Sequence, residues 1–240
     1  MLTYDSPVSM NGKHSSGANI AATMNTMASN PNPKPINATM VPVTSNNTIA
    51  KVNGHSAPKQ HHIWLVTGPA GCGKSTVAKH LSEALNLPYI EGDEFHPKAN
   101  IEKMANGIPL TDADRWDWLT ALREESLRQL AAGAEGVVLT CSALKRKYRD
   151  VIRVAPYYSH DVVLHFIYLH APESVLQERV GRRQGHYMGA NMVHSQFSIL
   201  EPPTAEETDV ISLDVSGSMD EVLKETLEKV FQKMDETASS

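Results

Sequence analysis

The chain has 240 residues, of which 41% are hydrophobic and 20% are charged, and its formal net charge is −5. This composition is ordinary for a globular protein. It has only two cysteines, Cys72 and Cys141, which excludes a disulfide framework and a Cys/His zinc site and suits a reducing cytosol. No apolar run approaches the length of a membrane span, so we expect a cytoplasmic protein without a membrane partner.

The first 60 residues differ in composition from the rest of the chain. Asn, Ser, Thr and Pro supply 28 of them, and no helical or alternating apolar period occurs there. We therefore predict a disordered low-complexity tail over residues 1–60 and one domain over residues 61–240. The tail has four lysines against one aspartate, so the domain has a net charge of −8 from 18 basic and 26 acidic residues. An acidic domain is a poor nucleic-acid binder, and we expect no such partner.

The predicted domain opens with a short apolar strand over residues 62–67, followed by the string GPAGCGKS and an amphipathic helix over residues 76–85. The string fits the pattern G-x-x-x-x-G-K-[ST] of a phosphate-binding P-loop, in the strand–loop–helix context that the motif requires. Glycines let the backbone turn its N–H groups toward phosphate, and the start of the helix adds a positive dipole end. The residues predicted to bind ATP are Gly68, Pro69, Ala70, Gly71, Cys72, Gly73, Lys74, Ser75 and Thr76.

Within this loop, Lys74 can reach the β- and γ-phosphates, and the Ser75 hydroxyl is suited to ligate Mg²⁺. The next strand, residues 88–91, leads into Glu91-Gly92-Asp93. Ligands of parallel α/β sheets lie at the carboxyl ends of the strands. One acid there can hold the waters on Mg²⁺, and the other can accept a proton from an attacking hydroxyl.

A cap at Thr111 or Asp112 predicts a helix that runs to about residue 132. Arg115 in its first turn is either a solvated residue or an anion-binding group. Trp116 and Trp118 are more typical of packing than of ligand stacking.

The apolar run over residues 136–141 predicts a central parallel strand in the place of a Walker B strand, but it lacks the terminal Asp. Glu91 and Asp93 are the available substitutes. A basic segment, residues 145–149, follows this strand, and we interpret it as a patch that faces an anionic substrate.

Further strands are predicted over residues 162–169 and 208–215, with a helix from Ala171 to about Arg183 and a final amphipathic helix. Arg182 and Arg183 introduce a segment without apolar pattern, typical of the mobile segments that close over a γ-phosphate. Strands and helices alternate, which predicts an α/β fold with a five-stranded parallel sheet and helices on both faces.

Several strings together resemble the gluconokinases, a family of small P-loop kinases related to shikimate kinases. They are GPAGCGKS, EGDEFHPKANIEKMANGIPLTDADRWDWL, CSALKRKYRDVIR, FIYLHAPESVLQERVGRRQGHYM and QFSILEPPTAEETDV. The resemblance covers about residues 61–235. It implies ATP-dependent phosphorylation of D-gluconate to 6-phospho-D-gluconate, a lid over about residues 184–196, and commonly a homodimer. The family often has Asp-Gly-Asp where this chain has Glu91-Gly92-Asp93, and a Glu keeps the charge needed for a water-mediated Mg²⁺ role.

The resemblance places Asp93 at the substrate, where it orients or deprotonates the 6-hydroxyl. Ser75 and Glu91 are the expected Mg²⁺ ligands, directly or through water. Arg182 or Arg183 is expected to stabilise the transferred phosphate. The remaining candidates for binding the gluconate carboxylate and hydroxyls are His96, Arg115, Lys145 and Arg149.

Three alternatives share parts of this pattern. A shikimate-type kinase would have the same P-loop and acids, but a glycine-rich substrate loop where this chain has Ser142-Ala143-Leu144-Lys145. A nucleoside monophosphate kinase would need a base-reading pocket. A non-catalytic nucleotide-binding protein is a third reading, against which the intact Lys74, Ser75 and Asp93 argue.

Overall fold

The computed structural model describes residues 60–182 and 190–238. The predicted tail, up to residue 59, and the first part of the predicted lid, residues 183–189, lie outside this range. The described residues contain a five-stranded sheet in the order β2-β3-β1-β4-β5, with every neighbouring pair parallel. The strands are β1 (His61–Thr67), β2 (Tyr89–Ile90), β3 (Gly136–Thr140), β4 (Val162–His170) and β5 (Val210–Asp214). The predicted α/β fold and sheet are confirmed.

Strand register places the two predicted motifs side by side. Val66 at the end of β1 is paired with Thr140 at the end of β3, and Ile90 at the end of β2 is paired with Leu139. The P-loop leaves β1 at the same edge of the sheet at which Glu91 leaves β2. This is the edge at which open parallel sheets bind ligands.

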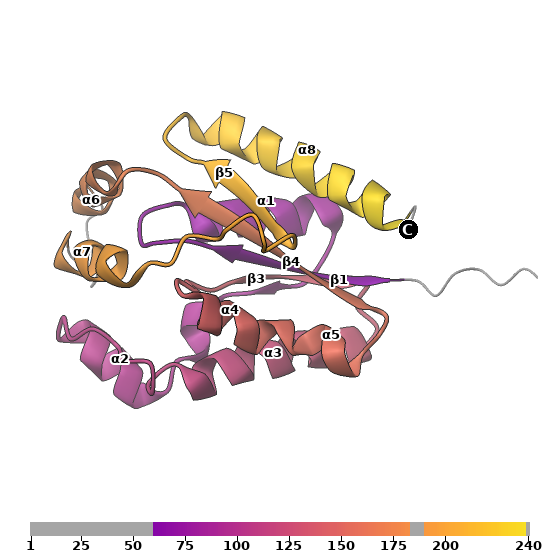
Figure 1. The fold of residues 1–240 in the computed structure, drawn as a ribbon, viewed down its shortest axis with the longest axis horizontal. Helices are drawn as coiled ribbons and strands as arrows, with labels where there is room; N and C mark the ends of the chain where they lie inside the picture. The colour runs from indigo at the N-terminus through magenta and orange to yellow at the C-terminus, as the bar shows by residue number, and fades with distance from the viewer. Residues whose placement is uncertain (1–59, 183–189, 239–240) are drawn as a thin grey trace, which may run out of the picture. The chain divides into compact units, whose positions relative to one another are not determined.

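Both faces of the sheet are buried, as the continuous apolar strands predict. Trp64 and Val66 of β1 pack on one side with α1 (Lys74–Leu85) and α8 (Met219–Ala238), while Ile63 and Leu65 pack on the other. That second side is covered by α3 (Trp116–Ala131), α4 (Arg146–Arg153) and α5 (Ala155–Tyr158). Figure 1 shows these helices in two layers, above and below the strands.

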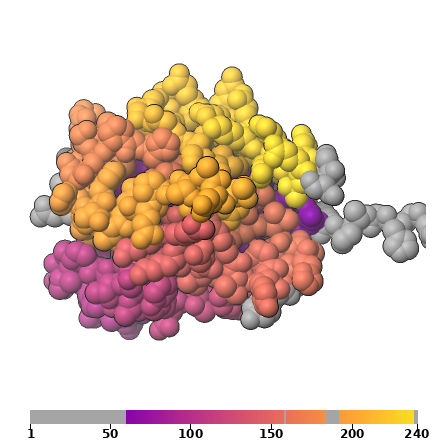
Figure 2. Space-filling view, in the orientation of Figure 1, coloured from indigo at the N-terminus to yellow at the C-terminus, as the bar shows by residue number. Residues whose placement is uncertain are grey.

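Four short elements surround the carboxyl edge of the sheet, namely η1 (Gly92–Phe95), α2 (Lys98–Ala105), α6 (Glu173–Gly181) and α7 (Ala190–Ile199). The second part of the predicted lid, from residue 190 onward, lies in α7. Figure 2 shows the surface of α7 above that of α2 at this end, and Met192 of α7 and Met104 of α2 line the same cleft.

The start of α3 was predicted three or four residues too early, since its N-cap is Arg115 and not Thr111 or Asp112. Asp114 accepts hydrogen bonds from both the N–H and the hydroxyl of Thr111, each at 2.8 Å, and the Arg115 N–H donates to the carbonyl of Asp112 at 3.0 Å. Residues 111–114 therefore form a turn closed by their own side chains, a structure that Asp and Thr favour in competition with a helix.

A buried ion pair fastens α4 to the segment before β5. The Arg149 guanidinium donates to both carboxylate oxygens of Glu207, at 2.7 and 2.6 Å, and each side chain is 2% exposed. Arg153 also donates to Glu207, at 2.6 Å. The guanidinium of Arg149 lowers the pKa of Glu207 from its ordinary 4.5 to about 2. The stability that this pair contributes is therefore present above about pH 4.5 and is lost as the pH falls towards 2.

We predict that Arg149→Met lowers the free energy of unfolding by about 3–5 kcal/mol, because it leaves the Glu207 carboxylate buried with only part of its partners. Arg146→Met on the same helix is the matched control, since its pair with Glu206 is exposed, and we expect a loss below about 1 kcal/mol. Urea unfolding of the two variants measures the difference. Equal losses of unfolding free energy would show that the buried pair contributes no more to stability than the exposed one.

Candidate active site

The P-loop has the backbone shape that its glycines predict. Gly68 has a φ of 138°, and a Cβ there would lie 2.3 Å from the Leu169 carbonyl oxygen. Gly73, with a φ of 94°, is the residue before α1. No side chain other than hydrogen fits at Gly68, so the loop can bend closely over the end of β4. The first N–H groups of α1 have no partner within the helix and point out of its N-terminus.

Lys74 and Ser75 occupy the first turn of α1. The Lys74 ammonium donates to the carbonyl oxygens of Gly68 and Pro69, at 2.9 and 3.0 Å. Ser75 and Thr76 are exposed at the floor of the cleft. The motif therefore presents an ammonium and two hydroxyls on one short stretch.

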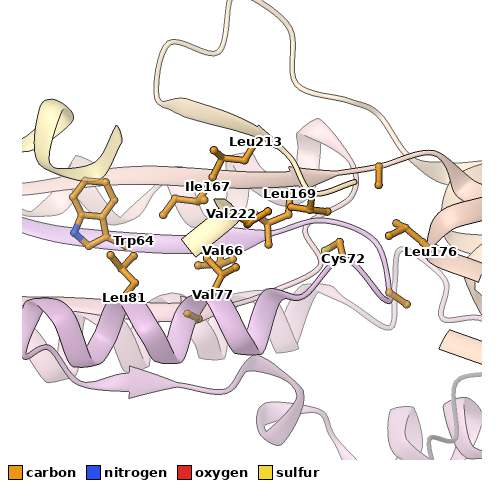
Figure 3. Close-up of a cluster of buried hydrophobic side chains, with 14 of the residues drawn as sticks. Trp64, Val66, Cys72, Val77, Leu81, Ile167, Leu169, Leu176, Leu213 and Val222 are labelled. Carbon is orange, nitrogen blue, oxygen red and sulfur yellow. The ribbon is translucent and has the colours of Figure 1, made fainter. Parts of the chain in front are cut away.

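Cys72 contributes to this loop through its backbone only. Its side chain is fully buried in the core between β1, β4 and α6, where Figure 3 shows it beside Leu169 and Leu176. Burial raises the pKa of its thiol, so Cys72 is neither a phosphate ligand nor a nucleophile through its sulfur.

The two acids of Glu91-Gly92-Asp93 are held in place by the end of β3. The Thr140 hydroxyl donates to Glu91 Oε1 at 2.5 Å and accepts from the Gly92 N–H at 3.0 Å. The indole N–H of Trp118 donates to the Gly92 carbonyl at 2.7 Å. A Cβ on Gly92 would lie 1.9 Å from the carbonyl oxygen of Thr140. Only glycine fits between the two acids.

Glu91 is ionised at neutral pH. Burial raises its pKa, but hydrogen bonds from Thr140, Tyr89 and Ser75 outweigh burial and bring the pKa below the usual glutamate value. Its carboxylate lines the same cleft as Ser75, the residue predicted to share a metal ion with it.

Asp93 extends into the cleft from η1 and is 54% exposed. His96 Nε2 lies 4.0 Å from Asp93 Oδ1, and the His96 ring stacks on Trp118 with centroids 4.0 Å apart. Burial, with a smaller contribution from Arg115, lowers the pKa of His96 to about 4. His96 is therefore a neutral hydrogen-bonding group at physiological pH.

Arg115 lines the cleft at its rim and is largely buried. Its guanidinium donates to the carbonyl of Leu110 and, at 3.0 Å, to that of Thr111, and it lies over the ring of Tyr148. These contacts tie the loop before α3 to its own arginine. Arg115 is therefore not a solvated residue, and its anion-binding role stays a prediction.

The predicted basic patch after β3 does not gather at the cleft. Lys145 donates to Asp112 at 3.0 Å, and Lys147 and Tyr148 bind the same carboxylate, which holds the pKa of Asp112 well below its usual range. Arg149 is buried in its pair with Glu207. Neither Lys145 nor Arg149 lines the cleft. The burial of Arg149 corrects its predicted role to a structural one, whereas the substrate-binding role of Lys145 stays a prediction.

Of the two predicted lid arginines, Arg182 does not line the cleft. Arg182 follows α6, is 76% exposed and pairs with Glu178. Arg183 lies outside the described residues.

Of the predicted residues, the cleft thus brings together Ala70, Gly71, Gly73, Lys74, Ser75 and Thr76 of the P-loop with Glu91, Asp93, His96 and Arg115. A sequence model of the family described as AAA domain matches residues 63–200. A probable gluconokinase of Schizosaccharomyces pombe is 46% identical over 190 residues, which are 79% of this chain and 97% of that protein. The chain belongs to the gluconokinase family.

Two further relatives agree with this assignment. The thermoresistant gluconokinase of Escherichia coli is 38% identical over 170 residues, covering 71% of this chain and 94% of that protein. The crystal structure of a gluconokinase from Sinorhizobium meliloti shares 39% identity and superposes with a TM-score of 0.64, over 75% of this chain and 96% of that one. The gluconokinase resemblance of the sequence is confirmed, and the protein is a kinase.

Some cleft residues of this family member were not found by sequence reasoning. Thr140, Met104, Leu110, Met192 and Gln196 all line the cleft. The missing Walker B acid at the end of β3 was a signal for Thr140, because a hydroxyl there can hold an acid from the neighbouring strand, as it holds Glu91. The others are ordinary helix and loop residues without a motif.

The cleft residues fit a phosphate-bound Mg²⁺ ion rather than a metal held by protein alone. Among residues 60–182 and 190–238, no group of three or more His, Cys, Asp or Glu side chains could hold a metal ion. Mg²⁺ usually takes one or two protein ligands and completes its shell with phosphates and water. The Ser75 hydroxyl and the ionised Glu91 carboxylate, which line the same cleft, meet that requirement. No helix of the described part is long and apolar enough to cross a bilayer.

We predict that Gly92→Ala lowers the free energy of unfolding by about 1–3 kcal/mol, because the added methyl group overlaps the backbone of Thr140. The displaced backbone also moves Glu91 and Asp93, so kinase activity should fall even at temperatures at which the variant is fully folded. Gly181→Ala at the end of α6 is the matched control, since a Cβ there meets no atom within 4 Å. Thermal unfolding and activity of both variants provide the test, and an active, stable Gly92→Ala protein would contradict it.

Proposed function

We propose that this protein transfers the γ-phosphate of ATP to the 6-hydroxyl of D-gluconate, giving 6-phospho-D-gluconate. The observation that carries the proposal is the position of two carboxylates, Glu91 and Asp93, in one cleft with Lys74 and Ser75 of the P-loop. Membership of the gluconokinase family supports gluconate as the acceptor.

The nucleotide side of the cleft is formed by the P-loop. Loop N–H groups and the N-terminus of α1 bind phosphate oxygens, and Lys74 exchanges its carbonyl contacts for the β- and γ-phosphates. Ser75 and Glu91 hold Mg²⁺, Glu91 through water. The ion neutralises charge on the phosphates when it is bound.

The acceptor side is formed by Asp93, His96 and Arg115. Asp93 accepts a hydrogen bond from the 6-hydroxyl and aligns the hydroxyl oxygen with the γ-phosphorus. It takes the hydroxyl proton as the new O–P bond forms and the bond between the γ-phosphorus and ADP breaks. Arg115 binds the gluconate carboxylate, since a guanidinium suits that anion. The neutral His96 donates to or accepts from a substrate hydroxyl. Arg182 or Arg183 approaches the transferred phosphate in the substrate-bound state.

The family resemblance also favours a homodimer.

The two buried thiols of Cys72 and Cys141 are compatible with a reducing cytosol as the compartment.

The direct test is ADP release by the purified full chain with Mg-ATP and a panel of acceptors. We expect turnover with D-gluconate and little with shikimate, other sugar acids or nucleoside monophosphates. Preferred turnover of another acceptor would overturn the substrate assignment and leave the phosphate chemistry. Nucleotide binding without turnover of any acceptor would favour a binding protein instead.

Asp93→Asn should lower kcat by about 10²–10⁴-fold, because an amide cannot accept the proton. ATP affinity should change little, since the P-loop residues are untouched. Asp117→Asn, an exposed acid in the first turn of α3, is the matched control and should retain full activity. A kcat for Asp93→Asn within tenfold of the wild type would show that Asp93 is not the base.

A further inference from the structure

Gln196 of α7 contacts the P-loop although it belongs to no phosphate-binding motif. Its side-chain oxygen accepts a hydrogen bond of 2.7 Å from the backbone N–H of Ala70, which is 126 residues away in the sequence. The side chain is half-buried and lines the same cleft as Lys74, Ser75 and Asp93.

This contact and a contact of Lys74 hold the two ends of one peptide group. The Lys74 ammonium donates to the carbonyl of Pro69 at 3.0 Å, and the N–H that follows this carbonyl, that of Ala70, donates to Gln196. When Lys74 turns to a phosphate, the Pro69–Ala70 peptide loses one of its two partners. Gln196 then holds that peptide in position.

The orientation of the Gln196 amide is fixed by the chemistry of its partner. A backbone N–H can only donate, so the amide oxygen must face Ala70 and the amide NH₂ must face away from it. Within residues 60–182 and 190–238, this NH₂ group has no hydrogen-bond acceptor. It is a donor beside a loop built to bind anions.

The helix that carries Gln196 is held by contacts other than this one. Val193 is fully buried in the core beside Leu176 and Val180. Beyond the end of α7, the Glu201 N–H donates to the Leu144 carbonyl at 2.8 Å, and the Glu201 carbonyl accepts from Arg149 at 3.1 Å. The position of Gln196 is therefore set before any ligand binds, which is the condition for a well-placed donor.

We propose that Gln196 is a γ-phosphate-binding residue: its oxygen fixes the Ala70 N–H and its NH₂ group donates to a terminal phosphate oxygen of the bound nucleotide. The N–H groups of a P-loop cradle the α- and β-phosphates. An additional donor in the cleft that Asp93 also lines is available to the phosphate that is transferred. The proposal rests on the proposed use of ATP, but not on the identity of the acceptor.

The test is the affinity of the full chain for ADP and for a non-hydrolysable ATP analogue, measured by calorimetry without any acceptor. Gln196→Glu keeps an oxygen for the Ala70 N–H and replaces the NH₂ donor by a second oxygen. Gln196→Met removes both groups at similar size. In each variant the preference for the triphosphate over ADP should fall by about 10- to 100-fold, as expected for a lost hydrogen bond to a charged group.

Ser198→Ala is the matched control, because Ser198 is an exposed residue of α7 that bonds only within the helix, and it should keep the wild-type preference. Equal weakening of both nucleotides in the Gln196 variants would overturn the proposal and leave Gln196 a purely structural role. An unchanged affinity for both would overturn it as well. If the wild type bound neither nucleotide, the proposed function would fail first, and this inference with it. If the wild type bound nucleotide but did not phosphorylate gluconate, only the acceptor assignment would fail and this inference would stand.

Discussion

The active site depends on the hydroxyl of Thr140, at the end of the strand next to the P-loop strand. This hydroxyl donates to Glu91 and accepts from Gly92, and the backbone of Gly92 is pressed against the Thr140 carbonyl. Glu91 and Asp93 therefore extend from a backbone that is tightly packed at Gly92. Glu91 lines the cleft with Ser75, on the proposed nucleotide side, and Asp93 lies near His96, on the proposed acceptor side. This placement agrees with the separate tasks proposed for the two acids.

The basic side chains near the cleft are divided between the cleft itself and structural ion pairs. The predicted domain is acidic, with a net charge of −8 from its 18 basic and 26 acidic residues, yet its proposed substrates are anions. Among residues 60–182 and 190–238, positive charge in the cleft comes from Lys74 and Arg115, since His96 is neutral. Most other basic side chains near β3 bind Asp112 or Glu207 and fix α4. Few cations remain in the cleft, so each can be directed at one anionic group.

The sequence predicted the fold and the phosphate site because their signals are local. Buried parallel strands appear as continuous apolar runs, and the glycines of the P-loop are required by backbone geometry, as at Gly68. The acids after β2 could be placed for the same reason, since strand ends of a parallel sheet share an edge. The start of α3 was misplaced because a turn closed by Asp114 competes with a helix cap that uses the same residue types.

The basic residues could not be sorted from the sequence. The sequence does not distinguish the roles of Arg115 and Arg149. Arg115 lines the cleft, whereas Arg149 pairs with Glu207, 58 residues further along the chain. The partner of a charged side chain is set by tertiary packing, so it cannot be inferred from the spacing of residues along one helix. Gln196 is a stronger case, because its partner lies 126 residues away and is a backbone N–H, which has no sequence signature.

These misassigned and unpredicted residues belong to one structural unit. Arg149 binds Glu207 and the carbonyl of Glu201, and Glu201 is bonded in turn to the loop after β3. That anchor holds the end of α7, and α7 presents Gln196 to the P-loop. A chain of contacts thus connects Arg149 to the phosphate loop, because it is bonded to the segment that follows the helix in contact with that loop. A residue chosen as a substrate ligand for its charge is better understood as part of the frame that keeps the phosphate loop in shape.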